Sequence, residues 1–344
     1  MKVPADSKED HSWIVGVTSL ATNGSVHHLD LFSCDKPGYL MIPGMEEGDE
    51  GGVTWDCGQS VNAEIPGLMR AQRCNVPRDF VVPFEFPNKT SEKFGMGFKV
   101  GPKSPFKYLV VEAHYNDVSY ASGKKTVVYF PELIEENAIP PKTEYTSVGF
   151  NVEFLTSDNS SRLRDSAMMI MGSIAGNIPR HAVTLLDSAC RYEHPEALNA
   201  VLYRSHTHTR GQLATGFRIK SKILGAESPS DVQLLGRQFP QHTTPYFPLL
   251  GSDGQRDEDL VVRIETGDLI AARCVYNNTE DRDIVVGEKA SDEMCFFYLI
   301  YYVDQNQSIP FPFRSCYTSD PSYTWRGDDR LAHVVDQIDM NSKL

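Results

Sequence analysis

Two histidines one residue apart and a distant methionine are the side chains in this chain whose types and spacing could do chemistry. His206 and His208 end the segment AVLYRSHTH (200–208), which is typical of a β-strand because it is rich in β-branched and aromatic residues. Since side chains alternate between the two faces of a strand, both imidazoles are expected on the same face as Arg204. Imidazole binds copper, zinc, iron or nickel, whereas the thioether of Met294 is a soft donor that selects Cu(I). Together they predict a copper site that passes through the reduced state.

The surroundings of Met294 strengthen this prediction, because a methionine by itself is more often a filler of the core. A disulfide between Cys274 and Cys295 would tie two adjacent strands together and hold Met294 beside the sheet. Met294, Phe296 and Tyr298 would then share one face. A zinc hydrolase is a weaker alternative, because it gives no reason for the methionine and the chain has no HExxH helix.

Arg204 and Tyr298 are candidates for binding a substrate. On the face of the two histidines, the guanidinium of Arg204 suits bidentate capture of a carboxylate beside the metal. Tyr298 could add a phenolic donor. An arginine that is only a solvated charge or an ion-pair partner is the alternative.

Three further histidines form a second candidate cluster. His27 and His28 are adjacent, and His114 lies far downstream in the strand-like segment FKYLVVEAHYND (106–117). Adjacent residues of a regular strand point in opposite directions, so both rings reach one metal only if the backbone twists or the rings use different nitrogens. We expect one Nδ1 and one Nε2 ligand. A merely polar strand segment is the alternative.

Length and composition predict a globular protein of two domains. A chain of 344 residues exceeds the size at which one hydrophobic core usually stops growing, and 40% of its residues are hydrophobic. The formal net charge of -13 argues against a nucleic-acid partner, which would need a basic surface.

Cysteines and sequons indicate the compartment. Seven cysteines without a CxxC pair favour a disulfide framework over a zinc site. N-x-S/T sequons, which fit a glycosylated surface, begin at Asn23, Asn88, Asn159, Asn277 and Asn306. No stretch reaches the roughly 18 apolar residues of a membrane span, and the N-terminus lacks an export signal. We expect a secreted or secretory-vesicle protein whose natural start, with its signal peptide, precedes Met1.

Short strand-like segments separated by Gly, Pro, Asn and Asp recur along the chain, and long amphipathic helical patterns are scarce. This spacing predicts an all-β fold of antiparallel sandwiches. The polar segment 157–164 marks the expected boundary between an N-terminal domain over 1–159 and a C-terminal domain over 160–318. Residues 319–344 are expected to form an extended or loosely held tail.

Several motifs carry a resemblance to a known family, in order over roughly residues 12–318. They are V-H-H-L-x-L-F-x-C (26–34), MGFKVG (96–101), V-x-x-H-Y-x-D (111–117), Y-R-x-H-T-H (203–208), GRQ-x-PQ (236–241), GDLIAARCVY (267–276) and SDEMC-x-x-Y-x-x-YY (291–302). The chain resembles the copper type II, ascorbate-dependent monooxygenases, and among them the members that hydroxylate peptidylglycines.

The resemblance implies two jelly-roll-like β-sandwich domains, each with one copper site, that face a shared cleft. The residues implied are His27, His28 and His114 for the electron-transfer copper, His206, His208 and Met294 for the catalytic, oxygen-binding copper, and Arg204 and Tyr298 for the terminal carboxylate of the substrate. The disulfides implied are Cys190–Cys316 and Cys274–Cys295, while the pairing of Cys34, Cys57 and Cys74 stays open.

The implied activity is hydroxylation of the α-carbon of a C-terminal glycine in glycine-extended peptides, the first step of peptide α-amidation. It would use two copper ions per chain, O₂ as co-substrate and ascorbate as reductant. The hydroxyglycine product needs cleavage by a lyase, which we expect on a separate polypeptide. Gln stands in the place of Arg204 in the dopamine-hydroxylating relatives, which favours a peptide over a small amine.

Two positions depart from the family pattern. Phe296 replaces an Asn two residues after the ligand methionine, so that one contact to the carboxylate is lost. Glu112 replaces a Gln and adds a negative charge near the electron-transfer copper. Two alternatives stay open, a dopamine β-hydroxylase-like monooxygenase of a small amine and a copper-binding homologue without turnover.

Overall fold

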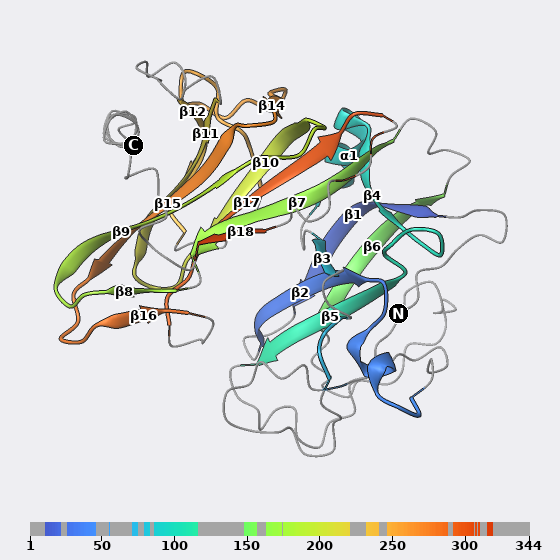
Figure 1. Cartoon of the computed structure of the whole chain (residues 1–344), viewed down its shortest axis with the longest axis horizontal. Coiled ribbons are helices and arrows are strands. Elements are labelled where there is room, and N and C mark those ends of the chain that lie inside the picture. The colour runs from blue at the N-terminus through green and yellow to red at the C-terminus, as the bar shows by residue number, and fades with distance from the viewer. Residues whose placement is uncertain are drawn as a thin grey trace. The chain divides into compact units, whose positions relative to one another are not determined.

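The computed structural model divides the chain into two compact units, residues 1–163 and 164–344 (Figure 1). The residues that the structure describes are 11–21, 26–45, 55, 71–74, 79–82, 86–115, 148–156, 163–173, 175–220, 232–240, 246–287, 292–305, 307, 309 and 315–318. For residues 20–21, 26–28, 79–82, 113–115, 148–149, 156 and 315–318 it describes the backbone alone.

The described part of the first unit consists of β1 (Ser12–Ala21), β2 (Val26–Cys34), the 3-10 helix η1 (Gly38–Met41), β3 (Asp79–Val82), α1 (Asn88–Phe94), β4 (Met96–Val100), β5 (Tyr108–Tyr115) and β6 (Val148–Thr156). β1 runs antiparallel between β4 and β6. β2 runs antiparallel between β3 and β5. Helix α1 ends at Gly95, whose left-handed conformation (φ 54°) is typical of the residue that terminates a helix.

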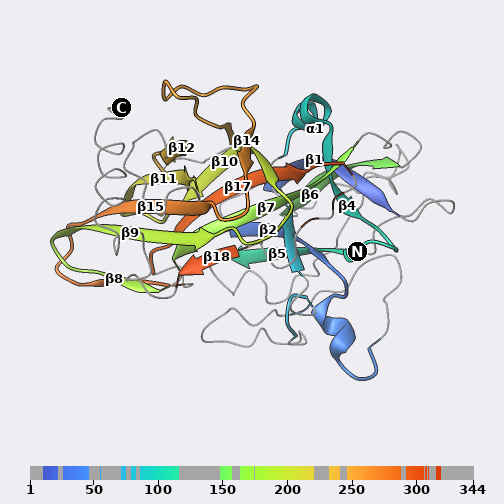
Figure 2. The ribbon, with the colours of Figure 1, turned by 45° about the horizontal axis from the view of Figure 1, so that its top comes forward.

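The described part of the second unit consists of β7 (Arg164–Ser173), β8 (Gly176–Ile178), β9 (Ala182–Arg191), β10 (Leu198–His206), β11 (Gly211–Ile219), β12 (Val232–Gln238), β13 (Phe247–Pro248), β14 (Val262–Ile264), β15 (Leu269–Asn278), β16 (Ile284–Val286), β17 (Cys295–Val303) and β18 (Ser315–Thr318). β10, β17 and β7 are consecutive antiparallel strands of one sheet, in which β13 and β14 pair with β10 and β18 runs parallel to β7. β12, β11, β15 and β9 form a second antiparallel sheet, and β8 pairs with β16. Figure 2 shows β9 beside β15 and β7 beside β17.

Two stacked aromatic rings lie between the two sheets of the second unit. The rings of Tyr203 in β10 and Phe297 in β17 are 5.5 Å apart with an interplanar angle of 3°. They lie against Gly236 and Gly216 of the second sheet, where an added Cβ would come within 2.4 Å and 2.3 Å of the rings. The second sheet therefore needs glycine at both positions. Because Tyr203 points toward the second sheet, its neighbour Arg204 points to the opposite face of the first.

The all-β expectation is confirmed. Strands dominate the described part of both units, and among the residues described above only α1 and η1 are helical. The segment 319–344, which was expected to form a tail, lies outside the described residues.

Candidate metal centre

His206 is the last residue of β10, and its partner across the antiparallel ladder with β17 is Phe296. Two residues earlier, Arg204 is paired with Tyr298 in the same ladder. Directly paired residues of two antiparallel strands lie on the same face of the sheet. These four side chains therefore share the face opposite to the one that carries Tyr203.

His208 lies beyond the end of β10, so the prediction that the strand continues to residue 208 is wrong. The chain turns here, because the backbone N–H of Gly211 donates to the carbonyl of His208 (3.3 Å) and β11 begins at Gly211. An added Cβ at position 211 would lie 2.0 Å from the hydroxyl of Thr207, so the turn needs glycine. The turn still brings the imidazoles of His206 and His208 together, with ring centroids 5.3 Å apart and an interplanar angle of 81°.

A backbone carbonyl orients the ring of His208. Its Nδ1 lies 2.6 Å from the carbonyl oxygen of Asp292. A carbonyl can only accept a hydrogen bond, so Nδ1 donates and the lone pair of the neutral ring sits on Nε2. Histidines that bind metals usually donate their second ring N–H to a carbonyl or carboxylate in this way. Asp292 is two residues before Met294, so this hydrogen bond also connects the His208 ring to the segment that carries Met294.

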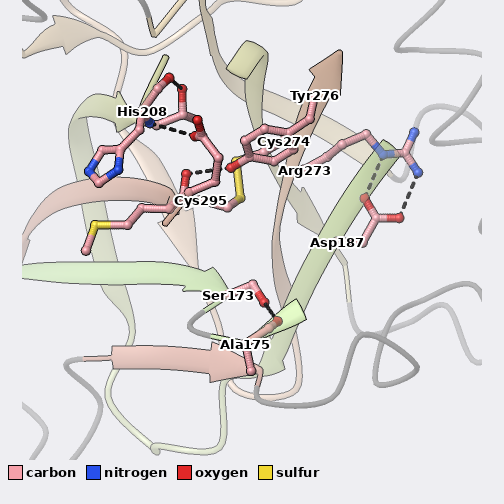
Figure 3. Close-up of a disulfide and its surroundings, with 11 residues drawn as sticks. Ser173, Ala175, Asp187, His208, Arg273, Cys274, Tyr276 and Cys295 are labelled. Carbon is pink, nitrogen blue, oxygen red and sulfur yellow. Dashed lines mark hydrogen bonds and ion pairs between the residues drawn. A yellow bond between two sulfur atoms is a disulfide. The ribbon is translucent and has the colours of Figure 1, made fainter. Parts of the chain in front are cut away.

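The segment that carries Met294 is held from several sides (Figure 3). The Tyr276 hydroxyl donates to the carbonyl oxygen of Met294 (2.5 Å), and Cys295 forms a disulfide with Cys274. The backbone of Glu293 pairs with β16 and its end through the Val285 carbonyl (2.9 Å) and the Gly287 N–H (3.0 Å). The main chain at Met294 therefore has little freedom to move.

The Cys274–Cys295 disulfide is confirmed, but not between adjacent strands as expected. Cys274 lies in β15 and Cys295 in β17, which belong to different sheets of the second unit. The bridge therefore links the two sheets. Figure 3 shows Arg273, the neighbour of Cys274, directed away from the disulfide toward Asp187, to which its Nε donates at 2.8 Å.

The carboxylate of Glu293 makes contacts that no sequence pattern predicts. Its side chain has an exposed fraction of 0%. The backbone N–H of His208 donates to Oε2 (3.0 Å), and the backbone N–H of Arg210 donates to Oε1 (3.0 Å). The signal in the sequence was an acidic residue directly before the candidate ligand Met294, but nothing local to Glu293 reveals a partner more than eighty residues upstream.

Arg204 lies among aromatic rings. Its guanidinium carbon is 5.3 Å from the ring centroid of Tyr298 and 6.0 Å from that of Tyr246. The ring of Phe296 lies 6.1 Å from that of Tyr298. Gly172 in β7 is the partner of Phe296, and an added Cβ there would come within 2.5 Å of the Phe296 ring. A cation beside phenol rings can bind an anion while the rings exclude water.

The second candidate cluster is described by its backbone alone. His28 in β2 is directly paired with His114 in β5. The register shifts between Val26 and His28, so His27 occupies a β-bulge. A bulge is the backbone irregularity that adjacent histidines need in order to serve one metal. The three side chains, and the expected split between Nδ1 and Nε2, lie outside the described residues.

The negative charge expected from Glu112 is paired. Nη1 of Arg73 donates to Oε2 of Glu112 (2.6 Å), and the exposed fraction of the Glu112 side chain is only 3%. The Arg73 guanidinium also lies over the ring of Phe32, 3.7 Å from its centroid. Arg73 precedes Cys74, which forms a disulfide with Cys34. No local pattern predicts this compensation, because Arg73 and Glu112 lie far apart in the chain.

The types of the candidate donors fit copper. Among the described residues no group of three or more histidine, cysteine, aspartate or glutamate side chains is arranged to hold a metal. The candidate set is instead two imidazoles and a thioether, from His206, His208 and Met294. Neutral imidazole with thioether suits a copper ion that passes through Cu(I). The orientation of His208 by the Asp292 carbonyl adds to that fit.

Comparison with known proteins decides the family. Residues 164–327 match the model of the copper type II ascorbate-dependent monooxygenase C-terminal domain. Over these residues the chain has the C-terminal domain of the copper type II, ascorbate-dependent monooxygenases. The matched region contains the whole face with His206, the turn at His208 and the Met294 segment.

The chain is similar to curated proteins over most of its length. It is 27% identical over 304 residues to peptidyl-glycine alpha-amidating monooxygenase B of Xenopus laevis, covering 88% of this chain and 27% of that protein. It is 24% identical over 314 residues to the Mus musculus amidating enzyme, covering 90% and 25%. Tyramine beta-hydroxylase of Caenorhabditis briggsae is 22% identical over 314 residues, covering 88% and 44%. The chain thus spans about a quarter of the length of the amidating relatives.

Cys190 is disulfide-bonded, while the Cys316 side chain and Cys57 lie outside the described residues. No helix in the described part of the chain is long and apolar enough to cross a bilayer.

Proposed function

We propose that this monooxygenase hydroxylates the α-carbon of a C-terminal glycine in glycine-extended peptides. The observation that carries the proposal is the position of Arg204, which lies two residues before His206 on the same face of β10 and opposite Tyr298. Two residues of a strand span about 7 Å. If Arg204 holds the terminal carboxylate of a substrate, the α-carbon bonded to that carboxylate would lie near the two imidazoles. Carbons further from the carboxylate would not.

Each residue has a defined task in this proposal. Arg204 binds the terminal carboxylate through paired N–H donors, and the phenol of Tyr298 adds a donor beside it. The rings of Tyr246 and Phe296 exclude water from the anchored end of the substrate. Fixing the substrate at its carboxylate orients the glycine C–H bond, so positioning supplies a large part of the rate enhancement. His206, His208 and Met294 would hold the catalytic copper.

The reaction balances with two electrons from ascorbate and two protons. One oxygen atom of O₂ enters the C–H bond, and the other leaves as water. Bound copper supplies the one-electron chemistry that O₂ needs. We propose that His27, His28 and His114 hold a second copper that relays electrons, so that two β-sandwich domains would carry one copper each and face a shared cleft. The hydroxyglycine product would pass to a lyase, and the enzyme would act in the secretory lumen.

A small-amine hydroxylase is the second candidate, because tyramine beta-hydroxylase of Caenorhabditis briggsae is also similar to the chain. The aromatic rings around Arg204 would suit a phenethylamine. The guanidinium itself opposes this reading, since it repels an ammonium group and attracts a carboxylate.

Oxygen consumption tests the proposal. The purified chain is incubated with copper, ascorbate and one of three substrates: a peptide ending in glycine, the same peptide with a C-terminal amide, or a phenethylamine. We expect uptake with the first alone, and a product heavier by one oxygen atom. Equal or greater activity on the phenethylamine would overturn the peptide assignment in favour of the amine. Copper binding without uptake on any substrate would identify a homologue without turnover.

A further inference from the structure

The carboxylate of Glu293 connects two segments that lie far apart in the sequence. The first is the turn at residues 208–210, whose two backbone N–H groups donate to its two oxygens. The second is the segment 292–295, to which Glu293 belongs and which is anchored to β15 and β16 by the contacts of Glu293, Met294 and Cys295. The carboxylate therefore links the turn that begins at His208 to the residue before Met294.

Arg210 supplies the charge that this buried carboxylate needs. Its Nη1 lies 3.3 Å from Oε1 of Glu293, and the exposed fractions of the two side chains are 20% and 0%. A buried carboxylate without a cation or donors is strongly unfavourable, so a partner is expected on physical grounds. Arg210 donates to this carboxylate through both its backbone N–H and its guanidinium.

The guanidinium of Arg210 is itself held by a second carboxylate, that of Glu280. Its Nε donates to Oε1 of Glu280 at 2.9 Å, and Nη2 contacts the same oxygen. Glu280 also accepts from Nε of Arg282 at 2.9 Å, and the Arg282 side chain is 66% exposed. The hydrogen bond to Glu280 is the main reason that the pKa of Arg210 is raised above its usual value. The chain of ion pairs thus runs from the solvent at Arg282 to the buried Glu293.

We propose that Arg210 and Glu293 form a latch that sets the distance between His208 and Met294, and that both are positioning residues for the catalytic copper. The latch is the set of three hydrogen bonds from residues 208–210 to the Glu293 carboxylate. The proposal rests on the assignment of His206, His208 and Met294 as copper ligands.

The geometry favours this role over a general contribution to stability. The disulfide at Cys295 and the hydroxyl of Tyr276 hold Met294 to β15. The backbone N–H of Asn277, also in β15, donates to the carbonyl of Arg210 (3.2 Å), so each segment is attached to β15. The latch, with the bond from the His208 ring to the Asp292 carbonyl, joins the two segments directly to each other. Direct bonds between the segments restrict the position of His208 relative to Met294 more than separate attachments to β15 do.

Four variants test the latch: Arg210→Met, Glu293→Gln, the double variant that combines them, and Arg282→Met as the matched control. Arg282→Met removes an arginine from the outer end of the same chain of ion pairs, where it contacts neither segment. For each protein we would measure Cu(I) affinity by competition with a chelator, and the copper–sulfur scattering path by X-ray absorption of the reduced, copper-loaded protein. Near-UV circular dichroism and thermal unfolding of the copper-free protein report folding.

We expect the three latch variants to lose about 10–100-fold in Cu(I) affinity at the methionine site, as is typical when groups behind the ligands are removed. Their copper–sulfur path should weaken or disappear, whereas Arg282→Met should match the parent protein. Arg210→Met removes the cation beside Glu293 and should lower thermal stability as well. The double variant removes both charges, so it should regain that stability and still lack the copper–sulfur path.

The outcomes separate two failures. No copper–sulfur path in the parent protein would overturn the ligand assignment, and with it the proposed function. A path in the parent that keeps its strength and affinity in Glu293→Gln and in the double variant would overturn the latch alone. Lower thermal stability with unchanged copper binding would also overturn it, because it would show that the contacts only stabilise the fold.

Discussion

Arg204 and Tyr298 lie directly opposite each other in the antiparallel ladder of β10 and β17, with the guanidinium carbon 5.3 Å from the centroid of the phenol ring. The pair of His206 and Phe296 lies two residues further along the ladder, on the same face. An anion site and an imidazole ligand are thus built from two strands that hold them in a fixed relation. This relation carries the prediction of a carboxylate-bearing substrate.

Arg204→Gln should lower kcat/KM for a glycine-extended peptide by about 10–100-fold, because one charge-assisted hydrogen bond contributes about 1.5–3 kcal/mol. Copper content should not change, since no ligand is removed. Arg164→Gln is a matched control, because Arg164 also lies over a tyrosine ring, that of Tyr302 at 3.7 Å. Steady-state kinetics of both variants provide the test, and an equal loss in both would contradict a carboxylate anchor.

Met294→Ile should abolish hydroxylation while the protein stays folded and keeps copper at the three-histidine site. A branched hydrocarbon side chain fills a similar volume but offers no donor to Cu(I). Copper content per chain and the copper–sulfur path of the reduced protein measure the effect. The exposed Met41, replaced by Ile in the same way, is the control. Turnover that survives in Met294→Ile would remove the methionine from the catalytic site.

Phe296→Asn should lower KM for a carboxylate substrate several-fold, because the amide adds a donor on the face of Arg204 where the phenyl ring has none. Phe296→Leu replaces the ring by a smaller apolar side chain without adding a donor, and it should not lower KM. If both variants behave alike, the effect comes from the space over Gly172 rather than from a hydrogen bond.

Replacement of Cys274 and Cys295 by Ala should lower the free energy of unfolding by about 3 kcal/mol, the value expected for a loop of this size. The two cysteines are 21 residues apart in sequence. Urea unfolding of the copper-free protein measures the change. A variant as stable as the parent would show that the rest of the core holds the two sheets together without the bridge.

Tyr276→Phe should reduce the loss of stability at alkaline pH. Burial raises the pKa of Tyr276 well above its usual value, and the nearby charge of Glu293 raises it further. The unfolded chain then ionises this phenol above about pH 10 while the folded protein does not. Folding is therefore penalised as pH rises from about 10 toward the folded pKa, by up to about 1.4 kcal/mol per pH unit. Unfolding of both proteins between pH 9 and pH 11 measures this difference, and parallel curves would contradict it.

Local patterns in the sequence were enough for the element types and the donor chemistry. β-branched and aromatic segments between turn residues predicted an all-β protein, because strand propensity and side-chain alternation are properties of neighbouring residues. The same alternation put Arg204 and His206 on one face. The types of the donors, two imidazoles and a thioether, predicted copper without reference to a fold.

Only the tertiary structure decided how the distant segments meet. The strand ends at His206, and the position of His208 follows from a turn held by Glu293 and by the Asp292 carbonyl. The Cys274–Cys295 disulfide joins two sheets rather than neighbouring strands of one. Such contacts join residues far apart in sequence, and their formation depends on which buried charges and polar groups can be satisfied together once the sheets are assembled. That requirement belongs to the assembled fold, and no single segment of the chain expresses it.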